Sequence, residues 1–136
     1  MGKKEKIIQF IKFCVVGASN FIVLYVVYAV VIFLGGSWLW GSLLGFVLSV
    51  LNAFFWNNRY VFKVEENEER LWWKTLIKTY ISYAFSGVLI ANALLFLWNN
   101  VIGIPELLGP VINLAVTTPI NYLMNKFWTF RTNRKK

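Results

Sequence analysis

The sequence predicts an all-α membrane protein of four transmembrane helices, built as two tandem helical-hairpin repeats of the same orientation. Composition is the first observation: 58% of the 136 residues are hydrophobic and 15% are charged, whereas soluble domains carry about 25% charged residues. The second is that residues 13–58 contain no charged side chain and residues 79–125 contain only Glu106. One span needs roughly 20 apolar residues. Each block is therefore long enough for two spans and a short connection.

The expected spans cover residues 13–34, 41–60, 79–98 and 108–128. Gly35 and Gly36 end the first span, and tryptophans lie near the ends of the others, as in the aromatic belts of membrane proteins. Trp72 and Trp73 are expected to begin a short helix on the membrane surface, and the acidic run at residues 65–69 to form a solvated loop. The whole chain, 1–136, is expected to be one integral membrane domain. Repeat one covers about residues 10–63, a loop about 63–76, and repeat two about 77–131.

The distribution of basic residues is the third observation, and it predicts the topology. All 14 Lys and Arg lie near the chain ends or between the two apolar blocks, and none lies in the connections at residues 35–42 and 99–109. Basic residues mark the cytoplasmic side of a membrane protein. We therefore expect both termini and the central loop in the cytoplasm.

Composition also excludes several kinds of function. The chain has no His and one Cys, which argues against imidazole catalysis, a metal site and a disulfide. The polar stretch between the blocks is too short for a soluble catalytic domain. We expect no enzyme activity, no cofactor and no metal. The net charge of +8 is explained by membrane orientation, so no nucleic-acid partner is expected.

The repeat is visible when the sequence is shifted against itself. A shift of 68 residues aligns Asn57 with Asn125 and the run at 60–63 with that at 128–131, and a shift of 66 aligns Lys12 with Lys78. Both copies start on the same side, so a parallel repeat about an axis along the membrane normal is expected.

Small and polar residues recur at every fourth position of the even spans. Gly41, Gly45 and Ser49 favour close helix packing. The amides of Asn113, Asn121 and Asn125 fit packing and function equally well, because unpaired amides are costly in lipid.

At these residues the chain resembles the GtrA-like family of small bacterial membrane proteins. The family pattern, Asn-aromatic-x-x-Asn-basic-x-aromatic-x-Phe, is complete at residues 121–130. The first copy keeps Asn57, Tyr60 and Phe62, but has Ala53 in place of the leading Asn and moves the basic residue to Arg59. The resemblance extends over about residues 10–131.

The resemblance implies translocation, or assistance in translocation, of a polyprenyl-phosphate-linked sugar across the bacterial cytoplasmic membrane. The sugar would serve glycosylation of cell-surface polysaccharide or teichoic acid. Partners would be the lipid-linked sugar and the cytoplasmic and membrane glycosyltransferases of the same pathway, within the lipid bilayer. A homo-oligomer is also expected, because four short helices enclose little space.

Candidate site residues follow from this reading. Each expected span has one basic residue at its cytoplasmic end, and together these are predicted to bind the lipid phosphate: Lys12, Arg59, Lys78 and Lys126. Snorkelling to the interface is the alternative explanation. The translocation path or motif is assigned to Asn57, Val61, Phe62, Asn113, Asn121, Asn125 and Phe130.

Two other functions remain open. One is a non-transporting accessory subunit that anchors a membrane glycosyltransferase. The other is an exporter like the small multidrug-resistance proteins, which is disfavoured because such exchange needs a carboxylate inside the membrane and Glu106 lies in an outer connection.

Overall fold

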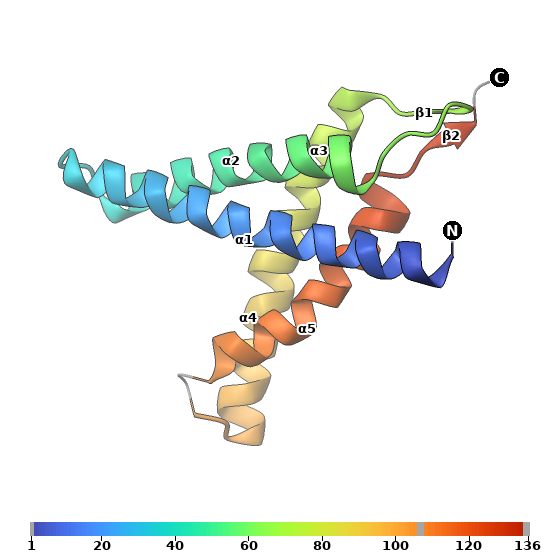
Figure 1. Cartoon of the computed structure of the whole chain (residues 1–136). Helices are drawn as coiled ribbons and strands as arrows, with labels where there is room; N and C mark the ends of the chain where they lie inside the picture. The colour runs from blue at the N-terminus through green and yellow to red at the C-terminus, as the bar shows by residue number, and fades with distance from the viewer. Residues whose placement is uncertain (1, 106–107, 135–136) are drawn as a thin grey trace. The chain divides into compact units, whose positions relative to one another are not determined.

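The fold, seen in a computed structural model that describes residues 2–105 and 108–134, is dominated by four long helical segments (Figure 1). The first is α1 (Lys3–Phe33). The second joins α2 (Trp38–Trp56) to the π-helical turn η1 (Asn57–Val61). The third joins α3 (Trp72–Ala84), η2 (Phe85–Ile90), α4 (Ala91–Phe96) and η3 (Leu97–Ile102). The fourth joins α5 (Gly109–Met124) to η4 (Asn125–Thr129).

Length and hydropathy identify the chain as an all-α membrane protein, as the sequence predicts. Within the described residues, three helical segments are long and apolar enough to span a membrane: Lys3–Phe33, Trp38–Val61 and Trp72–Ile102, of 31, 24 and 31 residues. The fourth segment contains three asparagines and Pro119, which lower its hydropathy. Glu106 lies outside the described residues.

The expectation of a separate surface helix at Trp72 is wrong. Trp72 and Trp73 form the first turn of α3, which continues as one helix to Ile102. Thr79, taken from the sequence as the start of the span, is preceded by Lys74 and Lys78. Lysines are good helix formers that can extend their ammonium groups toward the interface, so two of them do not end a helix.

The described residues divide into two compact units. Unit 1 contains those of Met1–Trp72 together with those of Thr132–Lys136, and unit 2 contains those of Trp73–Arg131. Each unit contains two of the four helical segments. The 68-residue repeat itself stays a prediction.

Unit 1 is an antiparallel hairpin of α1 and α2 (Figure 1). The turn between them uses Gly35 at φ 91°, a left-handed conformation that glycine adopts without strain. The helices then approach closely at two glycines. A Cβ atom on Gly45 would lie 3.0 Å from the Leu24 carbonyl oxygen, and one on Gly41 would lie 2.9 Å from the Tyr28 ring. The small-residue positions of α2 are therefore packing positions.

A short β-ribbon completes unit 1, where the sequence predicts only a solvated loop. Strand β1 (Glu68–Glu69) pairs antiparallel with β2 (Asn133–Arg134) (Figure 1), and in this pairing Glu68 lies opposite Arg134 and Glu69 opposite Asn133. The Thr132 hydroxyl donates a hydrogen bond to the Glu68 carboxylate, which also accepts one from the Glu65 backbone N–H at 3.2 Å. These bonds hold the pKa of Glu68 below its ordinary value.

The helices of unit 2 meet through both polar and apolar contacts. The Ser82 and Thr129 hydroxyls lie 2.5 Å apart, joining α3 to η4. Gly109 begins α5 in close contact with Leu95, whose side chain would lie 2.9 Å from a Cβ at this position. Thr79, fully buried, donates to the Thr75 carbonyl one turn before it.

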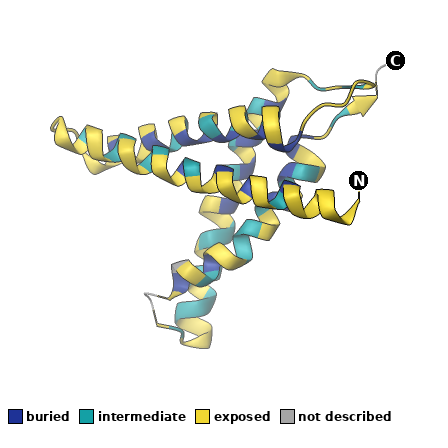
Figure 2. Cartoon of the chain, in the orientation of Figure 1, coloured by how far each residue is buried: buried dark blue, intermediate teal, exposed yellow. Residues whose placement is uncertain are grey.

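Burial is inverted relative to a soluble protein, as Figure 2 shows for the outer faces of the helices. Large apolar side chains such as Phe21 and Leu114 are 69% and 67% exposed, while fully or almost fully buried positions include Asn57, Thr79 and Asn125. Exposed apolar surface of this extent suits contact with lipid. These three polar side chains, which a bilayer would not tolerate unpaired, lie inside.

Candidate functional site

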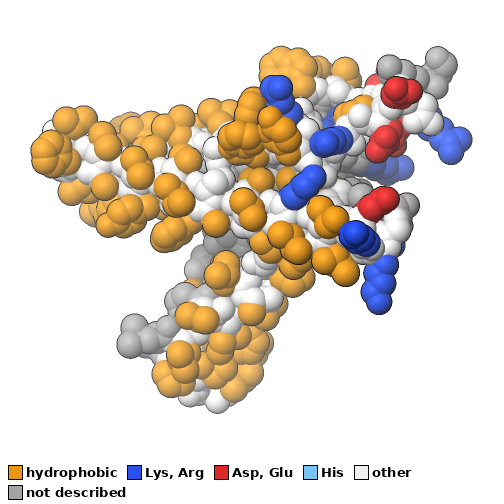
Figure 3. Space-filling view, in the orientation of Figure 1, with side chains coloured by type: hydrophobic (Ala, Val, Ile, Leu, Met, Phe, Trp, Pro, Cys, Tyr) orange, Lys and Arg blue, Asp and Glu red, His pale blue; other side chains and the backbone are white. Residues whose placement is uncertain are grey.

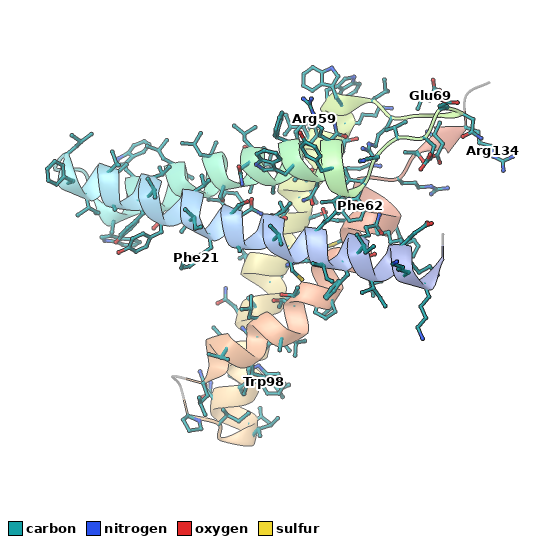
Figure 4. The ribbon with its side chains drawn as sticks, viewed as in Figure 1. Phe21, Arg59, Phe62, Glu69, Trp98 and Arg134 are labelled. Atoms are coloured by element: carbon teal, nitrogen blue, oxygen red, sulfur yellow. The ribbon has the colours of Figure 1, made fainter. Side chains whose placement is uncertain are left out.

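Basic side chains gather at one end of unit 1, which we call its basic end. It consists of the first turns of α1, which carry Lys12, and of η1, which carries Arg59; Figure 3 shows the Lys and Arg side chains over this end and hydrophobic side chains over the other. Lys12 and Arg59 are both exposed. The Arg59 guanidinium lies 5.6 Å from the centre of the Tyr60 ring and 6.0 Å from that of Phe55 (Figure 4). Aromatic contact thus orients a cation that remains accessible.

Two adjoining hollows lie at the basic end, between α1 and the end of the second helical segment. The apolar groove has a volume of about 500 Å³, and the polar pocket has one of about 240 Å³. The groove is lined by Ile11, Lys12, Val15, Val16, Ser19, Trp56 and Tyr60. The pocket is lined by Glu5, Ile8, Gln9, Lys12, Tyr60, Val61, Lys63 and Glu65. Lys12 and Tyr60 belong to both, so they mark the boundary between an apolar and a polar surface.

A polar network joins the two helices beneath the apolar groove. The Asn52 amide donates to the Asn20 side-chain oxygen at 2.8 Å and to the Ser19 hydroxyl at 3.0 Å. The Asn52 carbonyl oxygen accepts from the Trp56 indole N–H at 2.9 Å. Trp56 in turn stacks on Tyr60 with ring centres 5.3 Å apart. The network therefore fixes the aromatic wall of the groove.

Asn57 begins the π-helical turn η1 and is completely buried. Neither its side-chain nitrogen nor its side-chain oxygen has a hydrogen-bond partner among the described residues. A buried amide without partners costs about 1–3 kcal/mol. π-helical turns occur frequently at functional sites. The first residue of η1 is therefore a strong candidate for a group that acquires partners when the protein works.

The motif residues after Asn57 anchor η1 to α1. The Val61 carbonyl accepts a hydrogen bond from the buried Gln9 side chain at 3.0 Å. The buried Phe62 ring meets Phe13 edge to face, with centres 6.1 Å apart (Figure 4). The Phe62 backbone N–H closes the turn on the Asn57 carbonyl at 2.7 Å. Val61 and Phe62 thus position the turn.

Arg70 caps the same turn from the loop. Its guanidinium donates to the side-chain oxygen of Asn58 at 2.6 Å and to the carbonyl of Phe62 at 2.7 Å. Cations stabilise helix C-termini through the unsatisfied carbonyls. Partial burial lowers the pKa of Arg70 to about 10, so it stays charged at neutral pH.

In unit 2, Lys78 and Lys126 both contact aromatic side chains. The Lys78 ammonium lies 3.5 Å from the Trp128 carbonyl oxygen and 5.5 Å from the centre of its ring. The Lys126 ammonium donates to the Tyr122 hydroxyl at 3.4 Å and lies 5.7 Å from the Phe127 ring centre. Both cations are partly exposed.

Asn125 begins η4 as Asn57 begins η1, at the position 68 residues later. It is 1% exposed. Its amide donates to the Asn121 carbonyl at 2.7 Å, while its side-chain oxygen has no partner among the described residues. The Phe130 N–H closes the turn on the Asn125 carbonyl at 2.8 Å, and the Phe130 ring is buried. Asn121 itself is partly exposed one turn earlier.

Asn113 differs from these two asparagines because its amide is fully paired within unit 2. Its side-chain oxygen accepts from the Trp98 indole N–H at 2.8 Å, and its nitrogen donates to the Ala91 carbonyl at 2.8 Å. Trp98 is labelled in Figure 4. This geometry is that of a helix–helix contact.

Sequence reasoning missed Asn52, Trp56, Arg70 and both hollows. Asn52 and Trp56 are four residues apart, the spacing at which helical side chains meet. That signal was present in the sequence. The contacts of Arg70 and the hollows depend on how distant segments pack, and no local pattern reports them.

A protein-family model matches most of the chain. The family model described as GtrA/DPMS, transmembrane domain, matches residues 12–130. A search of curated proteins finds no significant match.

Proposed function

The chain belongs to the GtrA/DPMS transmembrane domain family, a family of membrane proteins for translocation of lipid-linked sugars, and from this membership we propose that it moves a polyprenyl-phosphate-linked sugar between membrane leaflets. The sugar would be used outside the cell for glycosylation of surface polysaccharide or teichoic acid. A cytoplasmic glycosyltransferase would load the carrier, and a membrane glycosyltransferase would consume it. The protein itself makes and breaks no covalent bond in this scheme.

One observation carries the proposal beyond family membership. In each unit, a π-helical turn begins with a buried asparagine that has unused hydrogen-bonding capacity, Asn57 or Asn125, and the next residues include a cation, Arg59 or Lys126. The unpaired side-chain nitrogen of Asn57 and the two cations can donate to a phosphate, whereas the unpaired side-chain oxygen of Asn125 can accept from a donor such as a sugar hydroxyl. An apolar transmembrane helix has little other use for such a pair.

The proposed phosphate ligands are the four cations. Lys12 and Arg59 serve unit 1, and Lys78 and Lys126 serve unit 2. Arg59 offers a planar fork of donors and the lysines offer point charges. Asn57 and Asn125 are closed from solvent, so we infer that η1 and η4 shift when the carrier binds. After Asn125, Asn121 would be the next residue to contact the carrier along the translocation path. Asn113 is assigned to packing.

The proposed location is the bacterial cytoplasmic membrane, with both termini and the basic ends of the helices in the cytoplasm. This orientation puts the cations on the side where the loaded carrier is made. It follows from the absence of Lys and Arg in the connections at residues 35–42 and 99–109.

The test is translocation in liposomes that contain only this protein. A fluorescent short-chain polyprenyl-phosphate sugar is placed in both leaflets, and the accessible fraction is followed with a membrane-impermeant quencher. Movement in this minimal system supports translocation. Absence of movement, with correctly folded and inserted protein, overturns it in favour of an accessory role beside a glycosyltransferase.

Asn57→Ala and Asn125→Ala are the informative variants. Each removes a buried amide that lacks at least one partner, so stability should change little while the translocation rate falls at least about tenfold. Asn92→Ala is the matched control, because Asn92 is exposed and bonds only the Val88 carbonyl of its own helix. Activity that falls only in proportion to folded protein would return both residues to a packing role.

A further inference from the structure

We propose that the apolar groove of unit 1 binds the isoprenoid chain of the carrier, with the phosphate at Lys12 and the sugar in the polar pocket. This inference rests on the proposed function and assigns the carrier a binding site in unit 1. It adds a binding surface that includes Val15, Val16 and Trp56, none of which is a defined position of the family motif.

The order of surfaces is the first argument. A polyprenyl-phosphate sugar is apolar along its chain, anionic at the phosphate and polar at the sugar. The hollows of unit 1 present the same sequence of chemistry: an apolar groove, then exposed Lys12 at the shared boundary, then a pocket lined by acidic, basic and amide side chains. A ligand that fills both hollows must place its middle segment beside Lys12. An anion at that point is complementary to the ammonium.

The size and direction of the groove are the second argument. From Lys12 to Ser19 the groove follows α1 for two turns, about 10 Å at 1.5 Å per residue. Its volume of about 500 Å³ lies within the usual range for ligand sites. The groove runs away from the charged turns of α1 and along its apolar part, so the chain would extend toward the bilayer interior.

The rigidity of the groove wall is the third argument. Trp56 is held by the Asn52 carbonyl and stacked on Tyr60, while Ser19 donates to the Val16 carbonyl at 2.7 Å and accepts from Asn52. The Ser19 hydroxyl and the Trp56 indole N–H, both in the groove lining, thereby have hydrogen-bond partners. A wall of paired polar groups and a fixed aromatic ring favours an apolar ligand, because these groups keep their hydrogen bonds when the ligand covers them.

The carrier is favoured over an ordinary phospholipid by the form of the site. Lys12 is the cation that lines the apolar groove, and the polar pocket beyond it offers about 240 Å³ for a bulky polar headgroup. A glycerophospholipid such as phosphatidylglycerol has two acyl chains and no sugar to fill the polar pocket. We therefore commit to the single-chain polyprenyl carrier, and competition by phosphatidylglycerol becomes an outcome of the test.

The experiment measures photocrosslinking of a polyprenyl-phosphate hexose with a diazirine in its second isoprene unit, using the full chain in nanodiscs. Crosslinked peptides should come from residues 11–19 and 56–60. Unlabelled polyprenyl phosphate should compete, and an equal amount of phosphatidylglycerol should not. Crosslinks outside these segments, or equal competition by phosphatidylglycerol, would overturn the assignment.

Val15→Trp fills the groove and should lower crosslinking about tenfold or more. The larger side chain keeps part of the isoprenoid chain out of the groove, and each methylene-sized group that is no longer buried lowers the affinity roughly fourfold. Ile22→Trp is the matched control. Ile22 is similarly exposed on α1, one heptad further along nearly the same face, and does not line the groove. It should crosslink like the unmodified chain.

The translocation assay separates failure of this assignment from failure of the proposed function. Loss of both crosslinking and translocation in Val15→Trp supports the groove as the carrier site. Normal translocation in Val15→Trp overturns the groove while the proposed function stands. Specific crosslinking in the groove without any translocation by the unmodified chain keeps the binding site and overturns the proposed function.

Discussion

Replacing Asn113 by alanine tests whether buried amides in this protein serve packing or transport. Asn113 is 6% exposed and makes two hydrogen bonds of 2.8 Å, one from the Trp98 indole and one to the Ala91 carbonyl. Side-chain hydrogen bonds between membrane helices average about 0.6 kcal/mol and reach about 1.7 kcal/mol. Loss of both bonds should therefore lower the free energy of unfolding by about 1–3 kcal/mol.

The assay is reversible unfolding of the purified protein in mixed micelles of a mild detergent and dodecyl sulfate. Trp98→Phe removes the indole N–H and supplies the second arm of a double-mutant cycle. The combined variant should lose less than the sum of the two single losses, because both remove the same hydrogen bond. Asn92→Ala should unfold within about 0.5 kcal/mol of the unmodified chain, as expected of an exposed side chain.

Translocation per folded molecule should be unchanged in Asn113→Ala. A variant that is fully stable but does not transport would refute the packing assignment, and would place Asn113 on the path with Asn121 and Asn125. Additive losses in the cycle would show that the bond to Trp98 contributes nothing measurable.

Three further predictions address packing, topology and the ribbon. Gly45→Ala should destabilise the chain by about 1–3 kcal/mol, because the new Cβ would lie 3.0 Å from the Leu24 carbonyl oxygen. Gly17→Ala, whose Cβ would have nothing within 4 Å, should be neutral or stabilising by up to about 1 kcal/mol. Unfolding in mixed micelles measures both variants. Reporter fusions after residue 134 and within residues 35–42 should give opposite signals, cytoplasmic and external, and an external signal from the first would contradict the orientation. Because the pKa of Glu68 is lowered in the fold, the ionised carboxylate stabilises the ribbon fully at pH values above its ordinary pKa of 4.5. This stabilisation is lost as the pH falls through the lowered pKa. Amide exchange at residues 68, 69, 133 and 134, corrected for its intrinsic pH dependence, should therefore lose protection at acidic pH, and Glu68→Ala should lack protection already at neutral pH.

The fold class was predictable because the bilayer imposes a simple rule. Twenty apolar residues without a charge satisfy the length requirement wherever they occur, and the four expected spans fall within the observed helices, apart from the last residue of the first span and the first of the fourth. Helix ends were less predictable. Lys74 and Lys78 look like the end of an apolar segment in sequence, yet they lie inside α3 because long cationic side chains are compatible with helix.

The candidate site was predictable only where residue type itself carries the chemistry. Lys12, Arg59 and the asparagines of the motif could be named from charge and polarity in an apolar chain. Whether an amide is paired could not be read in this way. Asn57 and Asn113 look alike in sequence, but one lacks partners and the other has two, because pairing depends on which neighbouring helix supplies a donor or carbonyl.

The β-ribbon has a consequence for the order of events during biosynthesis. Its strands are separated in sequence by all of unit 2, and Thr132 meets Glu68 across 64 positions. While the ribosome is still making the second pair of helices, the loop after η1 has no strand to pair with. Closing such a long loop carries an entropic cost and is a late event. The first hairpin would thus enter the membrane with its loop open, and the nascent chain would complete it only after the second hairpin has emerged.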